Sequence, residues 1–484
     1  MGMRPCTVLV RHGDVVTMDP FRRVIADGYV AVDGDRIVGV GPDHTCDFEA
    51  SGETIDASHH AVLPGFVNAH THSTDLLLRG GVCDDRRLYD WLVNVVDPGC
   101  RAYRDEDLAT ATELFCLEAL RSGITTVVDS VEVPIDRWEA TADMVLDVYE
   151  RAGLRTVYAQ MFYDAMPPDV QAVMEANDRR PPERREHFGA LMDLDAALKG
   201  IERLLQEHHG RAGGRIAVWP SPGVAILCSR EGLLGAQELA RRYGVMTTVH
   251  VCESPVDAVQ CGMSGIAYLE SIGYLGPDVL AGHCVQVSTS DIRLLARTGT
   301  KVATNPVSNL YLGNGVAPVG ELLAAGVTVG VGTDDANCNG GVNLLADLKV
   351  LALAQKGRYG DPGVLTAERA LEMATIDGAQ AVGMGDLIGS IEVGKKADLA
   401  LVDLRGSHLV PRHSVASVLV YQATGTEVDT VLVDGRVVLR DRQPVWLPPG
   451  AEAELLARAQ DASDRARRVA ELPPRSDDLW RSRA

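Results

Sequence analysis

Eight short apolar segments typical of buried strands alternate with segments typical of helices through the middle of the chain. The predicted strands are Val62–Asn68, Thr125–Val131, Thr156–Phe162, Ile216–Pro220, Met246–Val251, Val279–Cys284, Lys301–Thr304 and Thr328–Thr333. Buried strands that alternate with helices form parallel sheets, and eight such units close into a (β/α)8 barrel. An open doubly wound sheet is the alternative, but its usual G-x-G-x-x-G turn does not follow the first predicted strand. We therefore expect an α/β fold built on a TIM-like barrel.

The two ends of the chain are rich in short β segments and tight turns. Residues 5–60 contain the dipeptide Asp33-Gly34, and the later β-rich stretch contains Asp434-Gly435, both typical of hairpins. Neither stretch is long enough to make a stable sheet alone, so we expect the two to pair. The predicted domains are a small composite β domain at 1–60 plus 391–445, the barrel at 61–390, and a solvated helical tail at 446–484.

Charge and cysteine content argue against several classes of protein. The chain has 46 basic and 67 acidic residues, a formal net charge of −21, which disfavours nucleic-acid or anionic-membrane partners. It has no apolar run of about 20 residues that would span a membrane, and its start lacks the regions of a secretion signal. The ten cysteines are scattered without a C-x-x-C pair, as is typical of reduced thiols. We expect a cytoplasmic protein.

Four histidines and one aspartate lie at the C-terminal ends of predicted strands. His70 and His72 are two residues apart, so they point to the same face of an extended strand. His250, His283 and Asp334 end three other predicted strands. Active residues of such barrels sit at these ends, and divalent metals accept imidazole and carboxylate ligands. Each residue alone could be a core histidine or a helix cap, but together they predict a metal site.

Several motifs of this chain resemble those of the metal-dependent amidohydrolase superfamily, over about residues 5–445. They are PGFVNAHTH, HVCES, AGHC, NPVSN, GTDDANCN and the closing segment ATIDGAQAVGMGDLIGSIEVGKKADLALVDL. Within the superfamily the chain is most similar to the deaminase and chlorohydrolase branch, which includes cytosine, guanine and adenosylhomocysteine deaminases and the s-triazine hydrolases. The segment GTDDANCNGGVNLLADLKVLALAQK looks closest to the hydroxydechloroatrazine ethylaminohydrolases.

The resemblance implies a composite β-sandwich around the barrel and one bound divalent metal, zinc or alternatively iron. The ligands it implies are His70, His72, His250 and Asp334, with His283 holding the metal-bound water or supporting the metal, and Glu253 as proton shuttle. Two-metal relatives use a carboxylated lysine at the end of strand 4 or 3, or a glutamate. The corresponding segments VWPSPG and AQMFYD hold no lysine, which favours one metal. Thr304 stands where close relatives often have histidine.

These residues suit hydrolysis of an amino-substituted aromatic N-heterocycle. A bound metal makes water acidic, Asp334 accepts its proton, and His283 orients the nucleophile toward a ring carbon. Glu253 then acts as general acid toward the ring nitrogen and the departing ammonia or alkylamine. We expect an s-triazine such as hydroxyatrazine. The alternatives are a purine, pteridine or adenosine-type nucleoside and, more distantly, a cyclic amide or a non-catalytic scaffold.

Residues that contact the substrate are harder to assign from sequence. Six candidates are Arg79, Tyr89, Trp91, Gln160, Asn305 and Asn309. The first three lie on a long segment that could cover a flat ring or could equally pack as a helix on the barrel. The amides could read a ring's donors and acceptors, or the asparagines could only order their loop. We also expect a symmetric homodimer, which is common for enzymes of this type.

Overall fold

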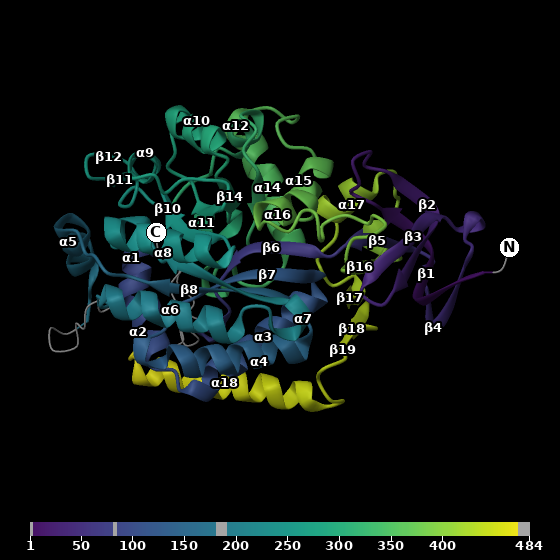
Figure 1. Ribbon diagram of the computed structural model, residues 1–484, viewed down its shortest axis with the longest axis horizontal. Helices are drawn as coiled ribbons and strands as arrows, with labels where there is room; N and C mark the ends of the chain where they lie inside the picture. The colour runs from purple at the N-terminus through teal and green to yellow at the C-terminus, as the bar shows by residue number, and fades with distance from the viewer. Residues whose placement is uncertain (1–2, 81–84, 181–190, 473–484) are drawn as a thin grey trace.

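The centre of the molecule holds two four-stranded parallel sheets. Some of their strands run across the middle of Figure 1. The computed structural model describes residues 3–80, 85–180 and 191–472. One four-stranded sheet contains β6 (Phe66–Thr71), β7 (Ile124–Val131), β8 (Arg155–Phe162) and β9 (Ile216–Pro222), and the other contains β10 (Thr247–Val251), β13 (Val279–His283), β14 (Lys301–Thr304) and β15 (Val329–Val331). Parallel bridges from Thr71 to Asp334 and from Val224 to His250 join the two sheets at both seams. The predicted (β/α)8 barrel is confirmed.

The first predicted strand is two strands that belong to different sheets. β5 (His60–Pro64) pairs with strands of the terminal sheet, whereas β6 begins the barrel. The chain changes sheet at Gly65, where a Cβ atom would lie 2.2 Å from the side chain of Thr125. The prediction of one strand from Val62 to Asn68 was wrong. The Pro64-Gly65 dipeptide marks the break, but both strands are fully buried, so the apolar run continues on either side of it.

Helices cover the outside of the barrel, as predicted. The longest are α3 (Asp105–Arg121), α4 (Trp138–Ala152), α6 (Leu194–His208), α8 (Arg230–Tyr243), α10 (Thr289–Thr298) and α14 (Leu344–Tyr359). Shorter ones are η2 (Ser73–Leu78), α1 (Leu88–Trp91), η3 (Leu92–Val96), α2 (Asp97–Arg101), α5 (Pro168–Asn177), α9 (Gly265–Ser271), α11 (Pro306–Tyr311), α12 (Val319–Ala324), α13 (Ala336–Asn339), α15 (Ala367–Met373), α16 (Ile376–Ala381) and α17 (Val415–Tyr421). α8 follows local rules at both ends, since Ser229 caps its first turn and Gly244 ends it at a φ of 67°.

The chain ends meet in one mixed sheet beside the barrel, at the right of Figure 1. Its strands are β1 (Arg4–Val16), β2 (Val24–Asp33), β3 (Arg36–Pro42), β4 (Phe48–Asp56), β5, β16 (Leu399–Asp403), β17 (Val428–Val433), β18 (Arg436–Arg440) and β19 (Gln443–Pro444). The N-terminal and C-terminal halves join where β5 pairs antiparallel with β16. Asp434 and Gly435 have φ of 48° and 71°, as a type I′ hairpin turn requires. This arrangement agrees with the predicted composite β domain, whose boundaries stay a prediction.

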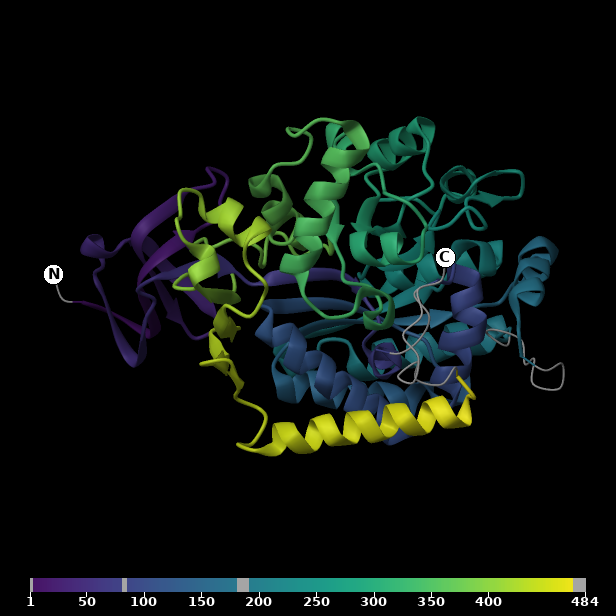
Figure 2. The ribbon, with the colours of Figure 1, turned by 180° about the vertical axis from the view of Figure 1, so that it is seen from behind.

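The C-terminal helix is a packed part of the fold. α18 (Ala451–Val469) lies along α3, as both views show (Figure 2), and buries Leu455 and three alanines. Its Arg458 also pairs with Glu113 of α3 at 2.6 Å. The predicted solvated tail is therefore corrected for this helix, and its last residues, 473–484, lie outside the described residues.

Two predictions about the whole chain can be compared with the described residues. Their nine cysteines are all free thiols, six of them buried, as the scattered spacing predicted. Among the same residues, no helix has the length and apolar character needed to cross a bilayer.

Candidate active site

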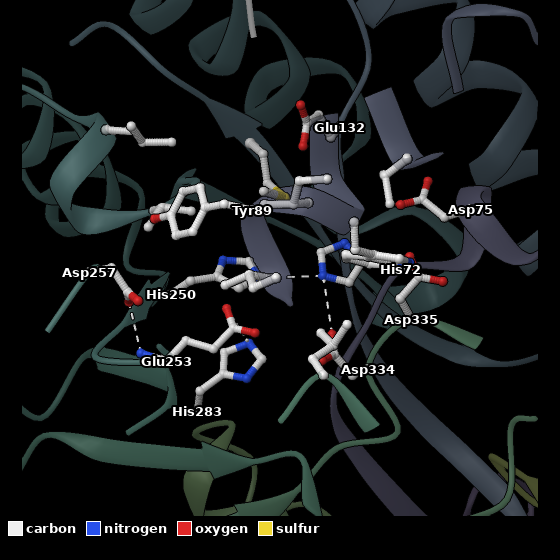
Figure 3. Close-up of a pocket in the computed structure, with 18 of the residues that line it drawn as sticks. His72, Asp75, Tyr89, Glu132, His250, Glu253, Asp257, His283, Asp334 and Asp335 are labelled. Carbon is white, nitrogen blue, oxygen red and sulfur yellow. Dashed lines mark hydrogen bonds and ion pairs between the residues drawn. The ribbon is translucent and has the colours of Figure 1, made fainter. Parts of the chain in front are cut away.

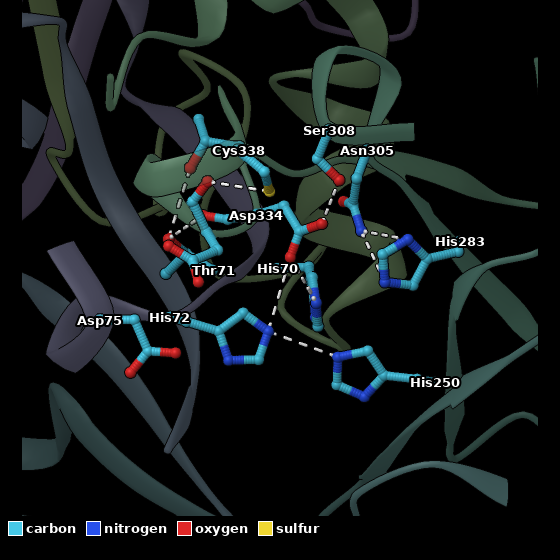
Figure 4. A network of polar contacts seen from close by, with 12 residues as sticks. His70, Thr71, His72, Asp75, His250, His283, Asn305, Ser308, Asp334 and Cys338 are labelled. Carbon is cyan, nitrogen blue, oxygen red and sulfur yellow. Dashed lines mark hydrogen bonds and ion pairs between the residues drawn. The ribbon is translucent and has the colours of Figure 1, made fainter. Parts of the chain in front are cut away.

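The four predicted histidines and the aspartate converge at the C-terminal end of the barrel (Figure 4). His70 lies in β6 and His72 directly follows that strand, while His250 and His283 lie in β10 and β13. The ring centre of His70 is 5.0 Å from that of His72, 4.6 Å from that of His250 and 5.3 Å from that of His283. Residues separated by up to 264 positions therefore share one small volume, as a closed barrel requires.

The potential ligand atoms of these side chains face one another at short distances. Asp334 Oδ1 lies 3.3 Å from His70 Nε2 and 3.5 Å from His72 Nε2, and His72 Nε2 lies 3.4 Å from His250 Nε2. Neither ring nitrogen of His70 has a hydrogen-bond partner within the described ranges, although the residue is 1% exposed. Leaving such a buried group unsatisfied costs about 1–3 kcal/mol. This donor set fits a divalent metal.

Burial sets the protonation states that ligands need. It lowers the pKa of His70 to about 4 and lowers that of His250 well below its usual value, so both imidazoles are neutral at pH 7. Burial alone would raise the pKa of Asp334, but His283 and His70 outweigh it and hold that pKa well below its usual range. Neutral imidazoles and an ionised carboxylate are the forms that bind metal.

Polar partners hold these side chains in place. His250 Nδ1 lies 2.5 Å from the carbonyl oxygen of Gly223, so its Nε2 must face the site. Asn309 Oδ1 lies 3.0 Å from His283 Nδ1, and the hydroxyl of Ser308 donates to Asp334 Oδ2. Such partners orient a ligand and tune its basicity.

Two of the converging residues also have unusual backbone conformations. His283 and Asp334 have φ of 68° and 59°, a left-handed conformation that non-glycine residues seldom adopt. Strain of this kind persists where the surrounding structure over-determines it, which is common at functional sites.

Glu253 faces the same pocket from the loop after β10. Its Oε2 lies 3.6 Å from His283 Nε2, and Asn314 Nδ2 donates to its Oε1 at 3.0 Å. Burial raises the pKa of Glu253 to about 8 against the opposing effect of His283, so this carboxyl group carries a proton at pH 7. Asp257 holds the loop by accepting the backbone N–H of Glu253 at 2.8 Å. The geometry therefore suits a general acid.

A cavity of about 60 Å³ lies over the histidines (Figure 3). Tyr89 and Trp91, two of the predicted substrate contacts, line it together with Leu88, Met161 and Leu312. Sequence reasoning missed four acidic lining residues, namely Asp75, Glu132, Asp257 and Asp335. Glu132 directly follows β7, so the strand-end rule that found the histidines would have found it too. Asp335 is not among the clustered ligand atoms, and its side chain caps α13.

The other four predicted substrate contacts do not line this cavity. Arg79 makes two hydrogen bonds to Glu118, at 2.7 and 2.6 Å. Gln160 is buried and donates to the backbone oxygens of β-strand residues 131 and 161. Asn305 Nδ2 lies 3.3 Å from His283 Nδ1, close to where Asn309 also contacts that ring. The two asparagines therefore contact the ring of His283, a role that neither of the two sequence alternatives named.

Comparison with known proteins adds independent findings. The sequence model of the amidohydrolase family matches residues 61–438. An S-triazine hydrolase of Gordonia rubripertincta is 36% identical over 470 residues, covering 95% of each chain. A 5-methylthioadenosine/S-adenosylhomocysteine deaminase of Moorella thermoacetica is 37% identical over 90% of this chain and 93% of its own. The crystal structure of an adenosine deaminase from Xanthomonas campestris with bound zinc superposes with a TM-score of 0.85 at 30% identity, covering 96% of this chain and all of that one.

Proposed function

The chain belongs to the amidohydrolase family, and from this premise we propose that it hydrolyses an amino-substituted aromatic N-heterocycle with the help of one zinc ion. The family assignment makes it a hydrolase that acts on carbon–nitrogen bonds other than peptide bonds. The observation that carries the proposal is the convergence of four imidazoles and Asp334 beside the buried carboxyl group of Glu253. The released product is ammonia or an alkylamine.

The proposed roles follow from the contacts of each side chain. His70, His72, His250 and Asp334 would hold the metal. A divalent metal held there would lower the pKa of a bound water molecule to about 7, which would supply a nucleophile at neutral pH. The Oδ2 atom of Asp334 is occupied by the Ser308 hydroxyl, which leaves Oδ1 to accept a proton. His283, fixed through its Nδ1, presents Nε2 to orient the attacking oxygen.

Glu253 completes the proton transfers. Since its pKa is about 8, its protonated carboxyl group can donate to the ring nitrogen next to the attacked carbon. Asn314 donates a hydrogen bond to Oε1 of Glu253. The other oxygen, Oε2, lies 3.6 Å from His283 and is therefore the atom that transfers the proton. Tyr89 and Trp91 on the cavity wall exclude water and give a flat ring an aromatic surface.

Two substrate classes are favoured by specific relatives. We favour an s-triazine, because the relative at 36% identity and 95% coverage is an S-triazine hydrolase. An adenosine-type nucleoside is the second candidate, because a deaminase named for 5-methylthioadenosine and S-adenosylhomocysteine is 37% identical. Pocket walls rather than metal ligands choose between such substrates.

A product-release assay tests the proposal directly. The zinc-loaded protein is incubated with hydroxytriazines, purines, pteridines and adenosine-type nucleosides, and released ammonia and alkylamines are measured. We expect release from at least one hydroxytriazine that carries an amino or alkylamino group. Release from nucleosides alone would favour the second candidate, and release from no N-heterocycle would contradict the proposal.

Two variants test the assigned roles. Glu253→Gln should keep the metal and lower turnover by about 10²–10⁴-fold, the usual contribution of a general acid. The matched control is Glu231→Gln, which changes an exposed acid of α8 and should have normal turnover. His250→Ala should lose metal and activity together, so an active, metal-loaded His250→Ala protein would remove that residue from the ligand set.

Metal analysis separates the remaining alternatives. We expect about one zinc per chain, whereas iron in its place would correct the choice of metal. Two metals would favour a cyclic amide hydrolase, and none would favour a scaffold. The homodimer and the cytoplasmic location stay predictions, for which sedimentation and cell fractionation are the measurements.

A further inference from the structure

A second cavity opens beside the one over the histidines. Its volume is about 300 Å³, which reaches the range of small-molecule sites, whereas the first cavity holds only about 60 Å³. The two cavities share Asp75, Val96 and Glu132 as lining residues, so these residues form their common wall. We call the larger cavity the side chamber. Glu132 and Asp75 therefore lie at the boundary between the cavity over the histidines and the side chamber.

The common wall presents two carboxyl groups, those of Glu132 and Asp75. Glu132 accepts a hydrogen bond from the hydroxyl of Tyr163 at 3.0 Å. Asp75 accepts from the hydroxyl of Thr74 at 3.1 Å and from the thiol of Cys100 at 3.4 Å, and it also shares a hydrogen bond with the carboxyl group of Asp335.

The charge of Arg101 also acts on this wall. Arg101 lines the side chamber and opposes the rise in the pKa of Glu132, but no ion pair joins Glu132 or Asp75 to a basic side chain within residues 3–80, 85–180 and 191–472.

An orphaned hydroxyl points to a ligand in the side chamber. Tyr103 lines the chamber and is 4% exposed, yet its Oη atom has no hydrogen-bond partner among the described residues. Buried polar groups are nearly always paired, and leaving one unpaired costs about 1–3 kcal/mol. A ligand or ordered water that enters the chamber would supply the missing partner.

We propose that the side chamber binds an amino or alkylamino substituent of the substrate, at a ring position other than the attacked carbon, and that Glu132 and Tyr103 select it. In Figure 3, Glu132 and Asp75 lie on one side of the histidines and Glu253 lies on the other. A ring whose nitrogen meets Glu253 therefore turns a different edge toward Glu132.

The chemistry of Glu132 matches such an edge in either protonation state. Burial and the nearby Asp75 raise the pKa of Glu132 to about 8, so it is mostly a carboxylic acid at pH 7. A carboxylic acid offers one donor and one acceptor side by side, which complements a ring nitrogen next to an exocyclic N–H. The ionised form accepts from N–H groups even more strongly. The inferred substrate class is a heterocycle with at least two amino groups.

This inference rests on the proposed function for the attacked ring, but its test measures binding without turnover. The probes are 2,4-diamino-1,3,5-triazine and 2-amino-4-methyl-1,3,5-triazine, which differ by one amino group in place of a methyl group of similar size. Each is titrated calorimetrically into the zinc-loaded Glu253→Gln protein. We expect the diamino probe to bind at least about 10-fold more tightly, the discrimination that one lost hydrogen bond to a buried polar group produces.

Variants assign that preference to the side chamber. Glu132→Leu, made in the same Glu253→Gln protein, should abolish the preference for the diamino probe. Tyr103→Phe should reduce that preference at an unchanged melting temperature, because the hydroxyl has no hydrogen-bond partner in the part of the chain that the structure describes. Glu139→Leu, the same substitution at an exposed acid of α4, should retain it. Equal binding of the two probes, no binding of either, or a preference that survives Glu132→Leu would overturn the inference.

The same probes separate this inference from the proposed function. Suppose that the active protein releases no ammonia from the diamino probe or any other N-heterocycle, but that Glu132 still makes the diamino probe bind more tightly. The proposed function is then wrong, and the inference about the side chamber is retained. If amine is released while the two probes bind equally, the inference about the side chamber is wrong and the proposed function is retained.

Discussion

A buried arginine joins the barrel to the terminal sheet, and removing its charge should destabilise the protein measurably. Arg155, the first residue of β8, is 1% exposed. Its Nε and Nη2 atoms donate to the two carboxylate oxygens of Asp398 at 2.9 and 3.1 Å, and Nη2 also donates to Asp434 at 2.5 Å. The substitution Arg155→Met keeps most of the side-chain volume but leaves two buried carboxylates without their main cation.

The expected cost follows from what remains around those carboxylates. Removing one partner of a buried ion pair costs about 3–5 kcal/mol. Lys396 and Arg215 still lie 3.5 and 3.7 Å from Asp434, so we expect the lower end of that range, about 3 kcal/mol. Unfolding entropy is about 2.1 cal/mol/K per residue, which gives about 1 kcal/mol/K if all 484 residues unfold together. The melting temperature should therefore fall by about 3 °C.

Differential scanning calorimetry in excess zinc measures this shift. The control is Arg203→Met, which breaks an exposed ion pair with Glu139 and should cost at most about 1 kcal/mol. Zinc content should be normal in both variants, because Arg155 lies at the opposite end of β8 from the metal ligands. If Arg155→Met melts at the same temperature as the control, the argument from uncompensated buried charge is refuted.

Three other changes have definite expected outcomes. Ser308→Ala removes the hydroxyl that donates to Asp334 and should weaken zinc binding by about 10–100-fold in a chelator competition. Unchanged zinc affinity would show that this hydroxyl does not support the ligand. Gln160→Ala should lower the melting temperature but leave KM unchanged, since that side chain bonds only inside the protein in this structure. Burial lowers the pKa of His60, but Asp429 raises it more, so the net shift is upward. The pair therefore stabilises the fold fully below the unfolded pKa of about 6.5 and less as pH rises through the folded value. Asp429→Asn should thus lower the melting temperature more at pH 5.5 than at pH 8.5, and an equal loss at both would contradict this linkage.

The amino-acid sequence by itself determined the barrel and the cluster of ligand groups. Strand position follows from local apolar runs, and the C-terminal ends of parallel strands always meet at one face of a closed barrel. The sequence therefore predicts that His70, His250 and Asp334 lie close together, although they belong to different strands. Glu253 was predicted in the same way, because it follows a ligand strand by only a few residues.

Tertiary structure decided which polar groups face which cavity. The asparagines 305 and 309 are close to the site in sequence pattern, but only the packing of α11 turns both toward His283. Local signals accompany the sheet change at Gly65 and the packing of α18, namely a Pro-Gly turn and an apolar helix face. Which sheet or helix each segment packs against depends on a surface supplied by a distant segment. The side chamber behind Glu132 arises in the same manner. Its walls come from the loop after β7, from η2 and from α2, and the space between them is set by how those elements pack.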